Sequence, residues 1–173
     1  MVRTVPFRVL IADDHAVVRG LLRVLLENQQ DWQVCGEAEN GFEAVAKAGQ
    51  LQPDLIILDL AMPEMDGLRA AREISTALPT VPILMHASYS SPELDMEAKK
   101  AGVQQVLSKN GGGDDLLRAI KALMRGKAPR EAAATVNVKI QAAALGASLE
   151  SSPSGQDPKV NSANDHTRPL LDS

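Results

Sequence analysis

The sequence predicts an α/β protein in which helices cover both faces of a parallel β-sheet. Over residues 7–125, short and continuously apolar runs alternate with longer segments whose apolar residues recur at helical spacing. The chain has 173 residues, of which 45% are hydrophobic and only 2% are aromatic. We therefore expect an aliphatic core, and we do not expect the stacked aromatic surfaces that bind single-stranded nucleic acids.

Each predicted element rests on a local pattern. Valine and leucine recur at a helical period after the first apolar run, and the turn pair Asn40-Gly41 separates the second strand from the second helix. The third strand is an uninterrupted apolar run, which is typical of a strand buried on both faces. Gly102 ends the fourth helix. The predicted strands are 7–12, 33–38, 55–58, 83–87 and 105–107, and the predicted helices are 15–29, 42–50, 68–78, 92–101 and 114–125.

Right-handed crossovers and two covered faces leave few ways to order five parallel strands. We predict the flavodoxin-like order 2-1-3-4-5, which is common for a doubly wound sheet of this size, with five helices around it. In such sheets, ligands bind outside the carboxyl ends of the strands. The residues that follow each strand are therefore the candidates for a functional site.

The composition divides the chain into three regions. Residues 1–125 hold 13 Lys and Arg against 17 Asp and Glu, whereas residues 126–173 hold five of each. We expect a folded domain over 1–125, an Ala-rich helix or linker over 126–150, and a disordered tail over 151–173, because this last part is rich in Ser, Pro and Asn.

The cysteine content and the hydropathy of the sequence indicate the cellular compartment of the protein. Cys35 is the only cysteine, so the chain cannot form an internal disulfide. No apolar run is long enough to span a bilayer, and the N-terminus lacks a signal-peptide pattern. We therefore expect a cytoplasmic protein.

Charged residues follow three of the predicted strands. Asp13 and Asp14 follow the first strand, Asp59 follows the third, and Lys109 comes shortly after the fifth. Taken alone, Asp13 or Asp14 would cap the next helix, and Lys109 would be a solvated loop charge. Helix capping does not explain carboxylates from two strands together with a lysine from a third. The combination therefore favours a functional site.

Three neighbouring carboxylates repel one another unless a cation neutralises them. Mg²⁺ suits such an oxygen-rich set, and it often bridges to phosphate. A lysine supplies a compact positive charge for a phosphoryl oxygen. The set therefore suggests phosphoryl transfer, with a carboxylate as the nucleophile.

Several further segments strengthen this interpretation, and they are Val9–His15, Pro53–Gly67, Pro82–Met85, Ala101–Val103 and Ser108-Lys109. In these segments the chain resembles the receiver domain of bacterial two-component response regulators, over about residues 7–125. Its first helix and its Asp-Leu-Ala-Met-Pro run are most similar to the receivers that precede a helix-turn-helix output domain.

The resemblance implies that Asp59 accepts a phosphoryl group from a phosphohistidine on a sensor kinase or phosphotransfer protein. Asp14 and Asp59 would bind Mg²⁺ directly, Ala61 would bind it through its carbonyl, and Asp13 would bind it through water or act as a supporting acid. Lys109 would hold a phosphoryl oxygen and would pair with Asp59 before phosphorylation. Such a protein promotes its own phosphorylation and dephosphorylation, and it is not a turnover enzyme.

Two positions depart from the family pattern. The fourth strand of receivers normally ends in a threonine or serine that binds the phosphoryl group, and here this residue is Ala87. Ser88 is adjacent, but a shift of one residue turns its side chain to the opposite face. Val106 stands where the fifth strand usually carries an aromatic residue that moves with the hydroxyl. We expect phosphorylation to be retained and its conformational readout to be altered.

We see no helix-turn-helix pattern after residue 125. That region has no net charge and therefore lacks the excess of basic residues that is typical of DNA-binding domains. We therefore predict a single-domain regulator that acts by protein contact, with the pairing of two copies left open. One alternative is a degenerate receiver that binds proteins without phosphorylation. A less favoured alternative is a Mg²⁺-dependent phosphohydrolase with an aspartate nucleophile, although that class requires a second acidic residue at the position of Ala61.

Overall fold

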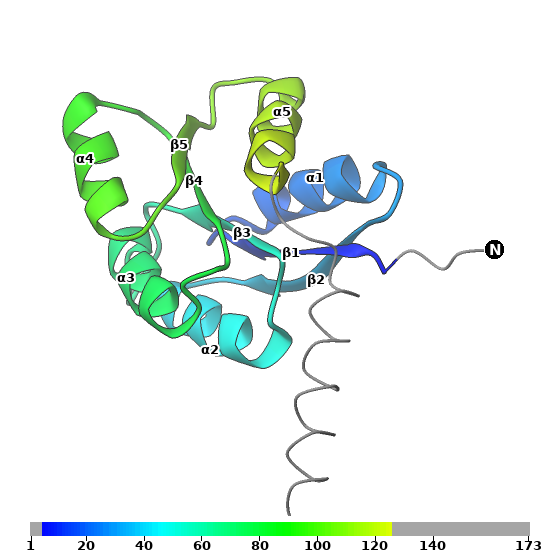
Figure 1. Ribbon diagram of the computed structural model, residues 1–173. Coiled ribbons are helices and arrows are strands. Elements are labelled where there is room, and N and C mark those ends of the chain that lie inside the picture. The colour runs from blue at the N-terminus through cyan, green and yellow to red at the C-terminus, as the bar shows by residue number, and fades with distance from the viewer. Residues whose placement is uncertain (1–4, 126–173) are drawn as a thin grey trace, which may run out of the picture. The chain divides into compact units, whose positions relative to one another are not determined.

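The computed structural model describes residues 5–125 (Figure 1). The regions that we expected over 126–150 and 151–173 lie outside the described residues. Within the described part, strands and helices alternate strictly. The strands are β1 (Phe7–Ala12), β2 (Trp32–Ala38), β3 (Leu55–Asp59), β4 (Ile83–Ala87) and β5 (Gln105–Ser108), and the helices are α1 (Ala16–Glu27), α2 (Gly41–Leu51), α3 (Gly67–Ala77), α4 (Pro92–Lys100) and α5 (Gly113–Met124).

The strands form one parallel sheet in the order β2-β1-β3-β4-β5, which confirms the predicted flavodoxin-like topology. Helices α1 and α5 lie on one face of this sheet, and α2, α3 and α4 lie on the other (Figure 1). All strands run in the same direction, so their carboxyl ends meet at one edge. The polar loops that leave this edge carry the candidate functional residues.

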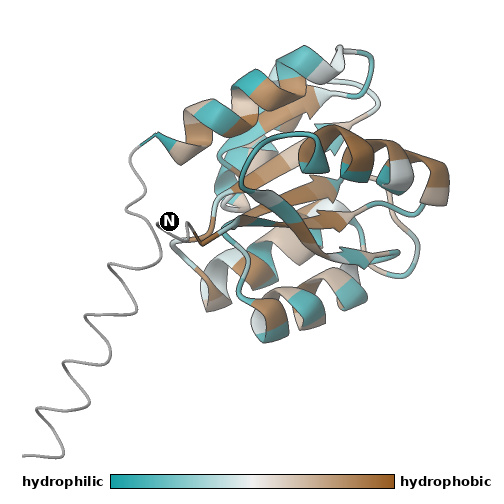
Figure 2. Ribbon diagram, turned by 90° about the vertical axis from the view of Figure 1, so that its right-hand side faces the viewer, coloured by the Kyte–Doolittle hydropathy of each residue, from teal (hydrophilic) through white to brown (hydrophobic). Residues whose placement is uncertain are grey.

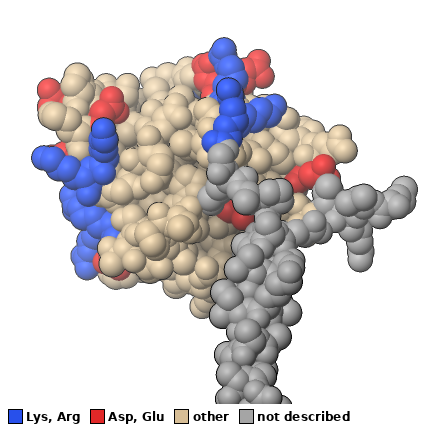
Figure 3. Space-filling view, viewed as in Figure 1, with Lys and Arg blue, Asp and Glu red and all other residues tan. Residues whose placement is uncertain are grey.

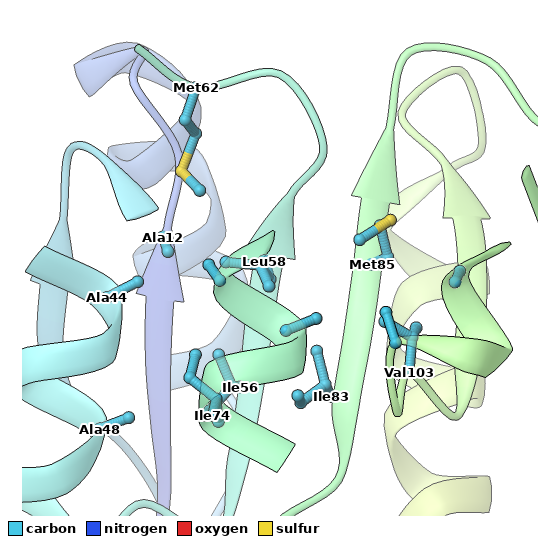
Figure 4. Packing of buried hydrophobic residues seen from close by; sticks show 14 of the residues in the cluster. Ala12, Ala44, Ala48, Ile56, Leu58, Met62, Ile74, Ile83, Met85 and Val103 are labelled. Atoms are coloured by element: carbon cyan, nitrogen blue, oxygen red, sulfur yellow. The ribbon is translucent and has the colours of Figure 1, made fainter. Parts of the chain in front are cut away.

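Apolar side chains fill the space on both faces of the sheet. In Figure 2 the strands are brown, while the helices show teal residues on their outer sides. Every residue of β3 and β4 is buried, which explains the uninterrupted apolar runs in the sequence. The cluster under α2, α3 and α4 contains side chains from strands and helices alike (Figure 4), including Ala44, Ile56, Leu58, Ile74, Met85 and Val103.

The second cluster lies under α1 and α5, and it contains Leu26, Ile57, Leu84 and Ile120. Close packing on both faces gives the strands one register, and a rigid register fixes the position of each strand end. No helix within residues 5–125 has the length and apolar character needed to cross a membrane.

Candidate functional site

Three charged side chains meet at the carboxyl edge of the sheet. Asp59 is the last residue of β3, Asp13 directly follows β1, and Lys109 directly follows β5. The N–H of Asp13 donates to the carbonyl of Ala38 in β2 at 3.1 Å, and the N–H of Lys109 donates to the carbonyl of Ala87 in β4 at 2.7 Å. Both residues therefore continue the backbone pairing of the sheet, which holds them at this edge.

Lys109 joins the two carboxylates. Its Nζ lies 2.7 Å from Oδ2 of Asp13 and 3.0 Å from Oδ1 of Asp59. The side chains of Asp13 and Asp59 are only 2% and 3% exposed, and that of Lys109 is 17% exposed. Two buried carboxylates facing one ammonium group leave an excess of negative charge, which a further cation would neutralise.

The environment shifts the pKa values of these groups. Burial raises the pKa of the Asp59 carboxyl and the charge of Asp13 adds to the shift, while Lys109 and the N–H of Ala61 oppose it. Burial acts to lower the pKa of Lys109, but its two carboxylate partners outweigh this effect and the pKa is raised. Burial and the Lys109 charge lower the pKa of neighbouring His86. Lys109 is therefore charged and His86 neutral at pH 7.

The loop between β3 and α3 packs tightly over Asp59. Asp66 caps α3, because its side chain accepts a hydrogen bond from the N–H of Arg69 at 2.8 Å. A Cβ atom on Gly67 would lie 2.0 Å from the carbonyl oxygen of Asp59, so only glycine allows this approach. The N–H of Ala61 donates to the Asp59 carboxylate. Ala61 thus lies beside Asp59, and the role of its carbonyl as a ligand stays a prediction.

Asp14 and His15 lie next to Asp13 in the turn between β1 and α1. The three residues each offer a ligand atom, and these atoms lie within 4.8 Å of one another. His15 Nδ1 is 2.6 Å from Oδ1 of Asp14 and 3.6 Å from Oδ1 of Asp13. His15 is the N-cap residue of α1, and its own side chain forms no capping hydrogen bond. The N–H of His15 donates to Oδ1 of Asp13 at 2.9 Å, so Asp13 accepts a hydrogen bond at the start of α1 while its other oxygen contacts Lys109.

This donor set fits a hard divalent cation. Carboxylate oxygens are the ligands that Mg²⁺ prefers, and Asp13 and Asp14 present theirs close together. The His15 side chain is 69% exposed, so it can turn into solvent when an ion binds. Asp59 is connected to this group through Lys109, which contacts both Asp59 and Asp13. The structure thus brings together the carboxylates that follow β1 and β3, as the sequence predicted.

The two departures from the family pattern lie on neighbouring strands and face the same cluster, although Val106 pairs with Met85, two residues before Ala87. Ala87 is 0% exposed in the cluster under α2, α3 and α4, and Val106 packs against the same cluster. Ser88 is exposed, so its hydroxyl does not take the place of the missing one. Tyr89 is 61% exposed and does not fill the position of the missing aromatic residue. Neither a hydroxyl nor an aromatic ring stands at these two positions.

One residue at the site was not predicted. Arg19 of α1 is buried, and its Nη1 donates to the backbone carbonyl of Asp13 at 2.7 Å. The sequence does contain a signal for it, because Arg19 stands three residues before Leu22 and seven before Leu26, on the buried face of α1. An arginine on an apolar face needs buried polar partners.

The fold agrees with the result of a family comparison. Residues 9–121 match the family described as response regulator receiver domain. The chain belongs to this family, whose members are signalling modules of two-component systems and are phosphorylated on an aspartate. Receiver domains bind Mg²⁺ at an acidic pocket and interact with histidine kinases or phosphotransfer proteins.

Curated relatives include longer proteins. The chain is 40% identical over 119 residues to the transcriptional regulatory protein YdfI of Bacillus subtilis (strain 168), and the match covers 69% of this chain and 55% of YdfI. It is 36% identical over 132 residues to the response regulator protein VraR of Staphylococcus aureus (strain Mu3 / ATCC 700698), with 76% of this chain and 63% of VraR covered. The matches thus span less than two thirds of either relative.

Solved structures of receivers share the fold. The response regulator domain of Thermotoga maritima CheB matches with a TM-score of 0.65 and 30% identity, over 71% of this chain and 99% of that one. A two-component response regulator of the LuxR family from Aurantimonas sp. SI85-9A1 matches with a TM-score of 0.67 and 28% identity, over 70% and 87% of the two chains.

Proposed function

We propose that Asp59 of this chain is the phosphoacceptor of a two-component response regulator. The observation that carries the proposal is the contact of one lysine with two buried carboxylates. Lys109 lies within 3.0 Å of Asp59 and 2.7 Å of Asp13, so the nucleophile and a group that stabilises phosphoryl oxygens are already in place. The donor is a phosphohistidine on a sensor kinase or phosphotransfer protein.

The reaction is an in-line displacement. An oxygen of Asp59 attacks the phosphorus atom, the new O–P bond forms as the P–N bond of the donor breaks, and the donor imidazole keeps the electron pair. Lys109 turns from Asp59 toward the equatorial oxygens and stabilises their charge. The N–H of Ala61 orients the attacking carboxylate, to which it already donates. The packed loop and strand edge keep these groups in position before the donor arrives.

Asp14 and Asp59 would hold a Mg²⁺ ion together with the carbonyl of Ala61, and Asp13 would bind it through water or act as a supporting acid. When bound there, such an ion would supply positive charge that offsets the carboxylates and the phosphoryl oxygens. This assignment explains why the site carries an excess of carboxylates over cationic side chains.

A small phosphodonor tests the proposal without a kinase. The purified protein is incubated with acetyl phosphate, with either Mg²⁺ or excess EDTA, and its intact mass is followed. We expect a gain of one phosphoryl group in the presence of Mg²⁺ and none with EDTA. Equal incorporation in both samples, or incorporation of several groups, would contradict a single metal-dependent acceptor.

We further propose that the receiver signals by contact with another protein and that it does not bind DNA itself. On the face shown in Figure 3, the Lys and Arg side chains lie in two separate groups, one over α4 and α3 and the other over α5, and they do not form one continuous basic surface on this face. Phosphate contacts in DNA binding require such a surface. The sequence of residues 126–173, with five basic and five acidic residues, does not add one.

A degenerate receiver, which binds its partner without phosphorylation, is the second candidate. The observation that favours this candidate is the pair Ala87 and Val106. These positions lack the hydroxyl and the aromatic ring that, in other receivers, respond to the phosphoryl group. Phosphorylation and readout are separable, since Asp59 and Lys109 are intact. The next experiment tests whether the missing hydroxyl limits the readout.

Replacing Ala87 with threonine is expected to strengthen the structural response to phosphorylation. The new hydroxyl would donate a hydrogen bond to the phosphoryl group and would draw the loop after β4 toward Asp59. Amide hydrogen exchange of α4 and β5, measured with and without acetyl phosphate, should change more in Ala87→Thr than in the wild type. Ala87→Val is the matched control, because valine has the shape of threonine without the hydroxyl. Equal responses in the two variants would refute this role of the hydroxyl.

A further inference from the structure

Arg19 occupies a place that is unusual for an arginine. It is 7% exposed, and all three of its nitrogen atoms donate hydrogen bonds. Nε donates to Glu37 of β2 at 3.1 Å, Nη2 donates to Glu39 at 2.7 Å, and Nη1 donates to the backbone carbonyl of Asp13 at 2.7 Å. Two carboxylates therefore neutralise the guanidinium charge, and the third contact reaches the functional site.

The contact with Asp13 fixes a particular peptide group. The N–H of Asp13 donates to the carbonyl of Ala38, so the residue is held from β2 on its amino side. Arg19 holds the carbonyl on the other side, and that carbonyl belongs to the peptide that joins Asp13 to Asp14. Rotation of this peptide would change the direction of both side chains. The two bonds together therefore define how the carboxylates that follow β1 are presented.

We propose that Arg19 is a positioning residue for the Asp13 and Asp14 carboxylates, and thereby for the divalent cation. This inference rests on the proposed function, because it assigns the cation to those carboxylates. Arginine suits the role because its planar group presents donors in fixed directions to three acceptors, which a lysine cannot do. The effect is geometric: the Arg19 charge is matched by Glu37 and Glu39, and the guanidinium donates to the backbone of Asp13.

Arg23 provides a matched control on the same helix. Its side chain also pairs with Glu37, with Nη2 at 2.7 Å from Oε1, and it pairs with Glu27 at 3.1 Å. Its described hydrogen bonds and ion pairs go to these two glutamates and not to the backbone of Asp13. Arg23→Gln thus disturbs the same cluster of charges without touching the peptide that presents the carboxylates.

The test is the Mg²⁺ dissociation constant of the full chain, measured by isothermal titration calorimetry. Residues that orient metal ligands typically change metal affinity by about 10- to 100-fold when they are replaced. We expect Arg19→Gln to raise the dissociation constant by at least about tenfold and Arg23→Gln to change it by less than about twofold. The phosphorylation rate of Arg19→Gln should recover toward that of the wild type when the Mg²⁺ concentration is raised.

Urea unfolding of each variant separates positioning from stability. If Arg19→Gln does not fold, Arg19→Lys takes its place, since it keeps the charge but cannot reach all three acceptors. A folded Arg19 variant whose Mg²⁺ affinity equals that of Arg23→Gln would overturn the inference. A wild-type chain that binds no Mg²⁺ would instead refute the proposed function, so the two failures are distinguishable.

Discussion

Replacing Asp59 with asparagine is expected to abolish phosphorylation and, at the same time, to stabilise the fold. The amide cannot attack phosphorus, so no phosphoryl group should be gained from acetyl phosphate. Burial and the Asp13 charge raise the pKa of Asp59, which shows that the folded protein disfavours the ionised carboxylate. A neutral side chain of the same shape should raise the free energy of unfolding at pH 7 by about 1 kcal/mol.

The pH dependence of this stabilisation follows from the sign of the shift. Because the folded-state pKa of Asp59 is raised, the folded protein retains a proton that the unfolded chain releases above about pH 4. Wild-type stability should therefore fall, relative to Asp59→Asn, as the pH rises through this interval. Urea unfolding of both proteins between pH 4 and pH 8 measures the difference. An asparagine variant that is less stable than the wild type at pH 7 would show that the carboxylate is not under electrostatic strain.

Replacing Lys109 with methionine is expected to damage both stability and function. The ammonium group is in contact with two carboxylates that are almost fully buried. Breaking a buried pair in this way typically costs about 3–5 kcal/mol, because the remaining charges lose their partner. Phosphorylation from acetyl phosphate should slow by about 10²- to 10³-fold, as is typical when one group that stabilises transition-state charge is removed.

Two further measurements identify the cause of the Lys109→Met effect. Adding the Asp59→Asn change should recover a large part of the lost stability, since only the Asp13 carboxylate then remains unpaired. Lys121→Met, at an exposed position of α5 whose Nζ contacts Gln29, is the control and should change stability by less than about 0.5 kcal/mol. If Lys109→Met were as stable as this control, the pairing of Lys109 with Asp13 and Asp59 would not be formed in solution.

The sequence was sufficient to predict the sheet, its strand order and the edge at which the site lies. This succeeded because β3 and β4 are buried on both faces, which leaves a clear apolar signal, and in β3 this signal ends at the charged Asp59. Asp13, Asp59 and Lys109 were expected together because parallel strands end at the same edge. The positions of helix ends were less accurate, since α1 ends at Glu27 and not at residue 29.

The contacts within the site depended on features that no sequence pattern specifies. Capping of α1 by Asp13 or Asp14 was a reasonable alternative, and one oxygen of Asp13 does accept from the N–H of His15, but its other oxygen contacts Lys109 in the site. Arg19 was overlooked because its partners Glu37 and Glu39 come from another part of the chain, after β1 and α1. Pairings of this kind follow from the register between β1 and β2, which is known only once the sheet is built.

Locating the phosphoryl group is the most direct test of the proposed function. The protein is treated with acetyl phosphate and Mg²⁺, the acyl phosphate is reduced with borohydride to a stable alcohol, and peptides are mapped by mass spectrometry. We expect the modification on Asp59 alone, in the peptide that spans the end of β3, and its loss when EDTA replaces Mg²⁺. Modification of Asp13, Asp14 or another residue, with Asp59 unchanged in a folded sample, would contradict the assignment of Asp59 as the phosphoacceptor.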